Sequence, residues 1–143
     1  LFTLAEVIEG ESLERARKAI RGLMELAPET ASVRQDDGSY LTSIHFDRAF
    51  CGFAGHFDHN PIVPAVCLVA AAEMLASDAV GKPLQLREIA QMKFKKLLAP
   101  EADAVFSFRQ NAAESGLYTF IFTITTGDGQ SVARIKLQLA ESA

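Results

Sequence analysis

The sequence is poor in cysteine, because Cys51 and Cys67 are the only two among 143 residues. Two thiols are too few for a disulfide framework, so both are interpreted as small buried apolar residues and a cytoplasmic location is expected. The chain also has only three histidines, and together with the cysteines they show no spacing typical of a metal site. We therefore expect neither a metal nor a cofactor.

Long apolar runs and an excess of basic residues are also missing. No segment approaches the ~18 to 20 uninterrupted apolar residues of a membrane span. The nearest one, from Pro64 to Val80, is interrupted by Glu73, Ser77 and Asp78. The net charge is −4 and the isoelectric point is near 5.4, whereas a nucleic-acid-binding protein needs a concentrated basic face. The sequence predicts neither a membrane span nor nucleic-acid binding.

Repeats, low-complexity tracts and linker-like segments are absent as well, so residues 1–143 are expected to form a single domain. A chain of this length can bury roughly two-thirds of its unfolded surface. The composition, 49% hydrophobic and 22% charged, is typical of a globular protein.

The N-terminal part of the chain predicts one amphipathic helix. Apolar residues recur at helical spacing from Leu13 to Ala27, and charged residues occupy the other sides. Ser12 is expected to cap the start of this helix, and Pro28 to stop it. Such a helix most often lies on the surface with one face on the domain.

Alternating residues predict an antiparallel sheet. Strands are expected over residues 30–35, 40–46, 84–96, 102–110 and 117–126 and around residues 133–139. Asp36-Asp37-Gly38-Ser39 predicts a hairpin turn, and another turn is expected at residues 111–116. In the second strand Ile44 lies on the apolar face, whereas His45 lies on the other face as a partly exposed residue. Strands joined by short turns are antiparallel neighbours.

The segment from Pro64 to about Val80 is almost entirely apolar, which predicts a helix buried on all sides. A twisted sheet with one apolar face can cover such a helix by wrapping around it. The stretch that leads into the helix contains His56, followed by Pro61 and Pro64, which hold the backbone extended. His56 is therefore expected beside the free N–H groups of a helix N-terminus, an arrangement suited to polarising a carbonyl.

The order G-H-F-x-x-x-P-I-x-P-x-V, from Gly55 to Val66, resembles the active-site segment of a known enzyme family. The family comprises the hotdog-fold 3-hydroxyacyl-[acyl carrier protein] dehydratases of the FabZ and FabA type, which include the ApeI-like dehydratases. A second segment, from Ile89 to Lys96 with Pro100 after it, resembles the strand that follows the family's central helix. The resemblance implies an α+β hotdog fold, in which an antiparallel sheet wraps around one long central helix, here with an added N-terminal amphipathic helix. It also implies activity on acyl thioesters in fatty acid biosynthesis.

The resemblance assigns roles to individual residues of the motif. His56 would be the base that removes the α-proton of a 3-hydroxyacyl thioester. The backbone N–H of Val66, next to Ala65, would hold the thioester oxygen as enolate character develops. The other pocket residues that the motif implies are Phe53, Phe57, Pro64, Cys67 and Ala70.

One departure from the family concerns the catalytic acid, because Ala70 stands where the family has its acid on the helix. Glu73 is one candidate substitute, rotated roughly 60° from Ala70 around the helix. His59, on the same loop as His56, is another, and Cys67 and Asp58 follow them. A further reading is that no acid exists because the reaction is not dehydration.

Three functions therefore stay open. The first is a dehydratase-like enzyme that acts on thioesters of acyl carrier protein or coenzyme A. The second is a thioesterase on the same scaffold, in which water is activated in place of an α-proton. The third is a non-catalytic module that binds acyl chains or carrier proteins. Fold alone cannot choose among them.

Two partners follow from the resemblance. The family's usual dimer, with its substrate tunnel at the subunit boundary, predicts a homodimer or a larger assembly. The only local concentration of basic residues is read as a landing surface for acidic carrier proteins or, alternatively, as solvated strand charge. Its members are Arg87, Lys93, Lys95 and Lys96.

Overall fold

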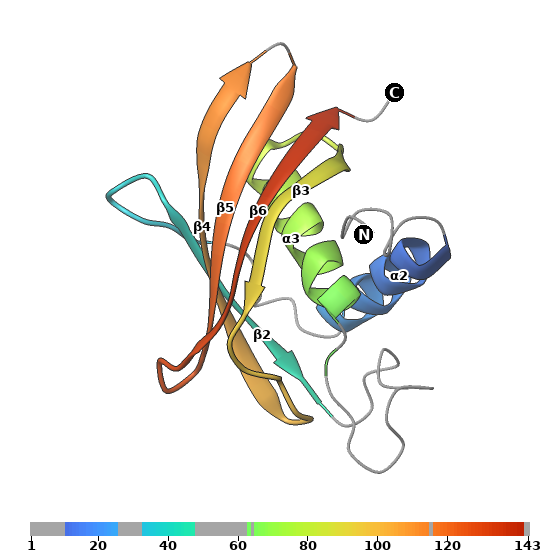
Figure 1. Ribbon diagram of the computed structural model, residues 1–143, viewed down its shortest axis with the longest axis vertical. Coiled ribbons are helices and arrows are strands. Elements are labelled where there is room, and N and C mark those ends of the chain that lie inside the picture. The colour runs from blue at the N-terminus through green and yellow to red at the C-terminus, as the bar shows by residue number, and fades with distance from the viewer. Residues whose placement is uncertain (1–10, 26–32, 48–62, 64, 115, 142–143) are drawn as a thin grey trace.

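The computed structural model describes residues 11–25, 33–47, 63, 65–114 and 116–141. Within these residues it has two helices and six strands (Figure 1). The elements are α2 (Glu11–Glu25), β1 (Val33–Arg34), β2 (Tyr40–Phe46), α3 (Ala65–Val80), β3 (Leu84–Phe94), β4 (Ala102–Glu114), β5 (Leu117–Thr126) and β6 (Ser131–Glu141). Neither helix is long and apolar enough to cross a membrane, as judged on the described residues.

All six strands form one antiparallel sheet in the order β1-β2-β4-β5-β6-β3. β4, β5 and β6 follow one another through tight turns, in which Gly116 and Gly129 take positive φ angles of 79° and 90°. The β1–β2 hairpin forms around the expected turn, where Gly38 has φ 86°. β3, which follows the helix α3, pairs with β6 at one edge of the sheet, so β3 is an edge strand.

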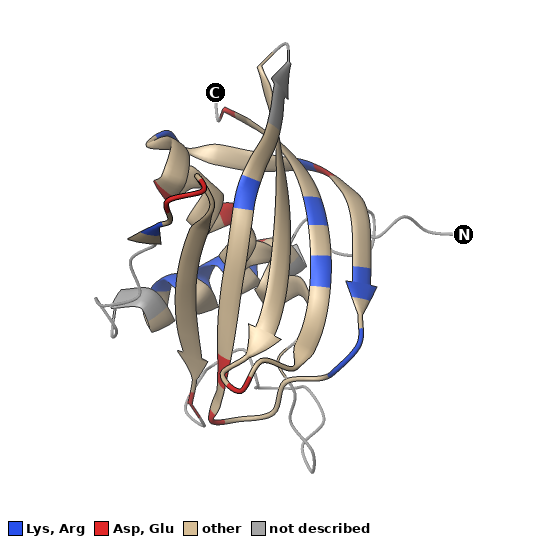
Figure 2. Ribbon diagram, turned by 90° about the vertical axis from the view of Figure 1, so that its left-hand side faces the viewer, with Lys and Arg blue, Asp and Glu red and all other residues tan. Residues whose placement is uncertain are grey.

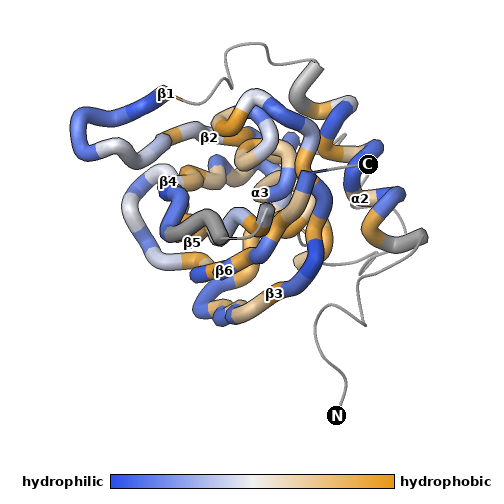
Figure 3. Tube along the Cα trace, turned by 90° about the horizontal axis from the view of Figure 1, so that it is seen from above, coloured by the Kyte–Doolittle hydropathy of each residue, from blue (hydrophilic) through white to orange (hydrophobic). Residues whose placement is uncertain are grey.

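The sheet curves around α3, and α2 packs against α3 on the side away from the sheet (Figure 1). In β2, β4, β5 and β6, residues alternate between the face toward α3 and the opposite face, so each of these strands gives one row of apolar side chains to the core. Figure 3 shows these hydrophobic positions around α3 and the hydrophilic positions of α2 on its outer side. The aromatic members of the core stack: the ring centroids of Phe108 and Phe122 are 4.8 Å apart, and those of Phe108 and Tyr40 are 5.3 Å apart. Each fully buried Phe stabilises the fold by about 1.5–3 kcal/mol.

The helix α3 is buried along most of its length, as its uniformly apolar sequence predicts. Residues 67–73 are all buried, and so are Leu75 and Ala76. The predicted architecture of an antiparallel sheet around one central helix, with an added amphipathic helix, is confirmed. In α2, Leu13, Ala16 and Ile20 are buried at the helical spacing that the sequence shows.

Three predicted boundaries differ from the structure. β4 continues through Asn111 to Glu114, so the turn expected at residues 111–116 is shorter than predicted. The pairing with β5 extends over these residues, past a register shift between Gln110 and Ala112, although they are weak strand formers. α2 includes Ser12, which therefore lies inside the helix and not at its cap. β3 ends at Phe94, two residues before the predicted end.

Candidate active site

Of the motif from Gly55 to Val66, the structure describes Val63 and the N-terminal end of α3. The helix begins at Ala65, which is exposed, and Val66 is half-buried. Helix geometry leaves the first N–H groups, including that of Val66, without a partner inside the helix, and the helix dipole adds partial positive charge. No acidic residue lies in the first turn of α3. This end of the helix can therefore stabilise negative charge on a ligand oxygen.

The predicted site residues divide into two groups. His56 and His59 lie outside the described residues, and so do the predicted pocket residues Phe53, Phe57 and Pro64. Cys67 and Ala70 are described, and both are buried, Ala70 completely. Both lie in the first two turns of α3, next to the predicted oxyanion donor. Val63, just before this helix, is buried, and its N–H donates to Leu98 O at 2.8 Å.

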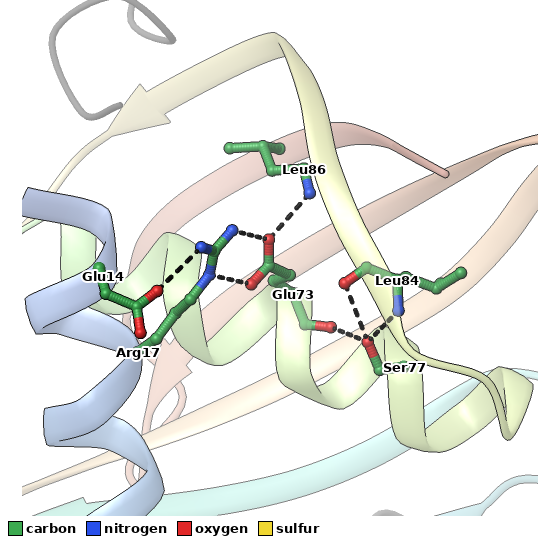
Figure 4. Close-up of polar contacts among 6 residues, drawn as sticks. All are labelled: Glu14, Arg17, Glu73, Ser77, Leu84 and Leu86. Carbon is green, nitrogen blue, oxygen red and sulfur yellow. Dashed lines mark hydrogen bonds and ion pairs between the residues drawn. The ribbon is translucent and has the colours of Figure 1, made fainter. Parts of the chain in front are cut away.

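Glu73 is the one acidic residue in the buried part of α3, and its carboxylate is held by α2 and β3 (Figure 4). Arg17 of α2 donates through Nε to Oε1 at 2.6 Å and through Nη2 to Oε2 at 2.8 Å. The backbone N–H of Leu86 also donates to Oε2, at 2.8 Å. Hydrogen bonding to Glu73 raises the pKa of Arg17, against the lowering effect of burial. The pair is a bidentate, largely buried ion pair, a geometry that arginine favours.

These contacts affect whether Glu73 can replace the family's catalytic acid as the proton donor. Both of its carboxylate oxygens accept hydrogen bonds, from a side chain and a backbone group of two other elements. A proton donor must carry a proton on one of these oxygens and direct it toward the substrate. A proton on either oxygen would remove the negative charge that pairs with Arg17, so Glu73 could act as the acid only with loss of this ion pair.

Ser77, one turn after Glu73, makes a second link between α3 and β3. Its hydroxyl oxygen accepts a hydrogen bond from the N–H of Leu84 at 3.0 Å, and its hydroxyl lies 3.0 Å from Glu73 O (Figure 4). Glu73 and Ser77 thus bind the N–H groups of Leu86 and Leu84, at alternate positions of the edge strand β3. The sequence shows Glu73 and Ser77 as polar interruptions of this apolar helix, but sequence reasoning missed Arg17. The signal was that a carboxylate on an apolar helix needs a cationic partner.

The predicted basic patch is exposed on β3 and just after it. Figure 2 shows the sheet from the side away from α3, with Lys and Arg positions, coloured blue, on several strands. The antiparallel register places Arg134 of β6 directly opposite Lys93, and Lys136 two residues further along β6. Like charges directly opposite each other are destabilising, and neither residue of this pair makes an ion pair with another residue that the structure describes. Sequence reasoning missed Arg134 and Lys136, because only strand pairing brings them to the patch.

Comparison with known proteins supports the fold. A family model described as ApeI-like, ApeI dehydratase, matches residues 32–136. One similar structure is the dehydratase heterocomplex ApeI:P from Xenorhabdus doucetiae, with 19% identity, a TM-score of 0.60 and coverage of 72% of this chain and 88% of that chain. No curated protein sequence matches significantly.

Two further solved structures have the same fold at lower identity. The Escherichia coli PaaI protein from the phenylacetic acid degradation operon has 10% identity and a TM-score of 0.62, with coverage of 90% of this chain and 96% of that chain. A hypothetical thioesterase protein with coenzyme A, from Streptococcus pneumoniae, has 8% identity and a TM-score of 0.62, with coverage of 87% and 97%. The predicted hotdog fold is confirmed.

Proposed function

Since the chain belongs to the ApeI-like dehydratase family, we propose that it is a dehydratase-like enzyme acting on 3-hydroxyacyl thioesters of acyl carrier protein or coenzyme A. The observation that carries the proposal is the family match over residues 32–136, which includes the whole motif from Gly55 to Val66. The described end of α3 supports it, because the motif leads into a helix N-terminus.

In the proposed reaction His56 removes the α-proton of the substrate. The electron pair moves toward the thioester oxygen, where the N–H of Val66 stabilises the developing enolate. The pair then forms the double bond and expels the β-hydroxyl group, which leaves as water after accepting a proton from an acid. The reverse sequence hydrates an enoyl thioester.

The acid is assigned to His59 in this proposal. Ala70 has no proton to donate, and Glu73 is held by Arg17 and Leu86. Of the candidates from the sequence we therefore choose His59, which lies three residues after His56 on the same segment. Glu73 is the alternative, and it requires the ion pair with Arg17 to open.

A thioesterase is the second candidate, and the observation that favours it is Ala70. A hydrolase that activates water needs no acid for a departing hydroxyl group, so alanine at this position would cost it less. A non-catalytic module that binds acyl chains or carrier proteins is the third candidate.

One assay separates the three. The protein is incubated with 3-hydroxyacyl and 2-enoyl thioesters of coenzyme A and of acyl carrier protein, at several chain lengths. The absorbance of the conjugated double bond and the release of free thiol are both followed. A change in the double bond without thiol release supports the proposal, thiol release identifies a thioesterase, and binding without either change identifies the binding module.

The substitution Ala70→Glu tests whether the pocket can still use the family's acid. We expect the rate of dehydration to rise by up to about 10²-fold. A carboxyl group in a buried apolar place tends to stay protonated, which suits a proton donor. Because Ala70 is completely buried, overpacking should lower the free energy of unfolding by roughly 1–3 kcal/mol.

Ala70→Gln is the matched control, since it has the same bulk and no acidic proton. It should show the loss of stability without the gain in rate, as measured by thermal unfolding and enoyl-thioester hydration on one preparation. A folded Ala70→Glu protein that is inert toward every chain length would count against dehydratase chemistry.

The proposed protein partner is an acyl carrier protein, which is acidic, and the basic patch is its proposed landing surface. The double substitution of Lys93 and Lys96 by glutamate should weaken carrier-protein binding about tenfold at low salt. The affinity of the unmodified protein should fall as salt rises. Isothermal titration at two ionic strengths measures both effects.

The control for the carrier-protein binding experiment reverses two charges outside the basic patch. Lys18 and Arg21 are exposed on α2, and their joint replacement by glutamate leaves the patch intact. Equal binding by the patch variant and this control would remove the patch from the proposal.

We also propose that the protein forms a homodimer or a larger assembly; the similar ApeI:P structure is itself an assembly, although of different chains. The described sheet has two edge strands, β1 and β3, and β3 is much the longer of the two. The N–H groups of Leu84 and Leu86 are already bound by α3, so a second copy would pair with the later residues of β3, toward Phe94. The low cysteine count leaves the cytoplasm as the proposed location.

A further inference from the structure

The segment that contains His56 begins where β2 ends, and a charged cluster lies at that point. The ring of His45 lies on the sheet face away from α3, with Nδ1 2.7 Å from Asp103 Oδ1 and Nε2 3.0 Å from Glu101 Oε2. Asp103 is directly opposite His45 in the register of β2 and β4. Glu101 lies two residues earlier, in the connection between β3 and β4.

The same connection holds the backbone on both sides of the motif segment. The N–H of Glu101 donates to Phe46 O at 2.7 Å, just before the undescribed residues 48–62. The N–H of Val63, just after them, donates to Leu98 O at 2.8 Å. Residues 98–101 therefore fix the two ends of the segment in place.

Glu101 has an unusual conformation, with a positive φ of 70°. This conformation is uncommon for residues other than glycine, and it persists only where the surroundings hold it. Two of the contacts that hold Glu101 are its backbone bond to Phe46 and its side-chain contact with His45.

The charge of His45 decides whether the side-chain contact is favourable. Both ring nitrogens face carboxylate oxygens, so both should carry a hydrogen, which makes the ring a cation. Hydrogen bonds to Asp103 and then Glu101 raise the pKa of His45 above its ordinary value, against a lowering effect of burial. A neutral ring must turn an unprotonated nitrogen toward one of the two carboxylates, which is repulsive.

The sign of the pH dependence follows from the raised pKa of His45. The contact contributes its full stabilisation below the ordinary histidine pKa of about 6.5. It is lost as the pH rises through the raised pKa of the folded protein. The charged groups that face the ring are Asp103 from β4 and Glu101 from the connection. On the other side of β2, β1 pairs only with Tyr40 and Leu41.

We propose that His45 is a positioning residue, which in its protonated form holds Glu101 and thereby the connection that fixes both ends of the segment containing His56. The proposal rests on the proposed function in taking His56 as the base. It implies that the connection and the flanking residues Phe46 and Val63, which it binds, are held together most firmly at mildly acidic pH.

Three variants test the proposal. His45→Leu removes the charge and the hydrogen bonds, and His45→Arg keeps a cation and several donors at every pH. Ser43→Leu is the control, because Ser43 is exposed on the same face of β2, two residues away. The first readout is amide hydrogen exchange of peptides covering residues 47–63 at pH 6 and pH 8.5, corrected for the intrinsic effect of pH.

We expect exchange in the unmodified protein and in Ser43→Leu to be about two- to fivefold slower at pH 6 than at pH 8.5. His45→Leu should exchange fast at both values, and His45→Arg slowly at both. Equal exchange in the unmodified protein and His45→Leu at pH 6 would overturn the proposal. This readout needs no substrate, so it decides whether His45 holds the segment even if the protein turns over no thioester.

The second readout is turnover at pH 6, which tests the consequence for the reaction. His45→Leu should lower kcat by about two- to fivefold with little change in KM, and His45→Arg should restore it. An active enzyme in which His45→Leu changes exchange but not kcat would also overturn the positioning role. A protein without activity in any variant would refute the proposed function and leave the exchange result to stand by itself.

Discussion

Arg17→Ala is expected to lower the free energy of unfolding by about 2–4 kcal/mol, although Arg17 lies on a surface helix. The reason is that the carboxylate of Glu73 would keep only the N–H of Leu86 as a partner in a buried place. Removing one member of a buried ion pair typically costs about 3–5 kcal/mol. The side chain of Arg17 is 20% exposed, so water can partly replace it, which sets the lower range.

Denaturant unfolding at a fixed protein concentration measures this loss. Lys18→Ala is the matched control on the same helix, because Lys18 is exposed and its removal should change stability by less than about 0.5 kcal/mol. Adding Glu73→Gln to Arg17→Ala removes the unpaired charge and keeps an acceptor for Leu86, so it should recover part of the loss. A double variant no more stable than Arg17→Ala would show that an unpaired charge is not the cause.

His56→Ala should reduce dehydration and hydration by about 10²- to 10⁴-fold, the range for losing one acid–base group. The melting temperature should stay close to that of the unmodified protein, because the substitution removes a group proposed to act on substrate and not to support the core. The measurement is kcat/KM for an enoyl thioester, with thermal unfolding of the same preparation.

His59→Ala is the companion variant, since the two histidines have different proposed roles. It should also lower the rate of dehydration but leave proton exchange at the α-carbon of the substrate, which needs only the base. Full activity in His56→Ala would show that the base is another residue.

The sequence predicted the core of the fold because its strands carry an unambiguous alternation. Tyr118, Phe120, Phe122 and Ile124 occur at every second position, and all face the helix in the structure. The central helix was equally clear, since a segment of that length that is almost entirely apolar has to be buried. The end of β4 was missed because local preference there is weak, and the pairing partner in β5 decides the structure.

The parts of the candidate site that sequence reasoning missed depend on contacts between distant segments. Arg17 and Glu73 are 56 positions apart, and α2 offers several other cations on its polar sides. Arg134 joins the basic patch only through the register of β6 and β3. The contacts of His45 were missed for the same reason, because the strand pattern gives its exposure and not its partners. Helix packing brings Arg17 to Glu73, and strand pairing brings the other residues together. A single sequence specifies both only weakly.

The ion pair between Arg17 and Glu73 joins α2 to α3, so α2 belongs to the same folding unit as the sheet and the central helix. The family match covers residues 32–136 and leaves out α2 and the last residues of β6. A fragment cut to the family boundaries would lose Arg17 and the buried side chains of Leu137 and Leu139. The segment that matches the family model is therefore shorter than the folding unit of this protein. A recombinant version should include α2.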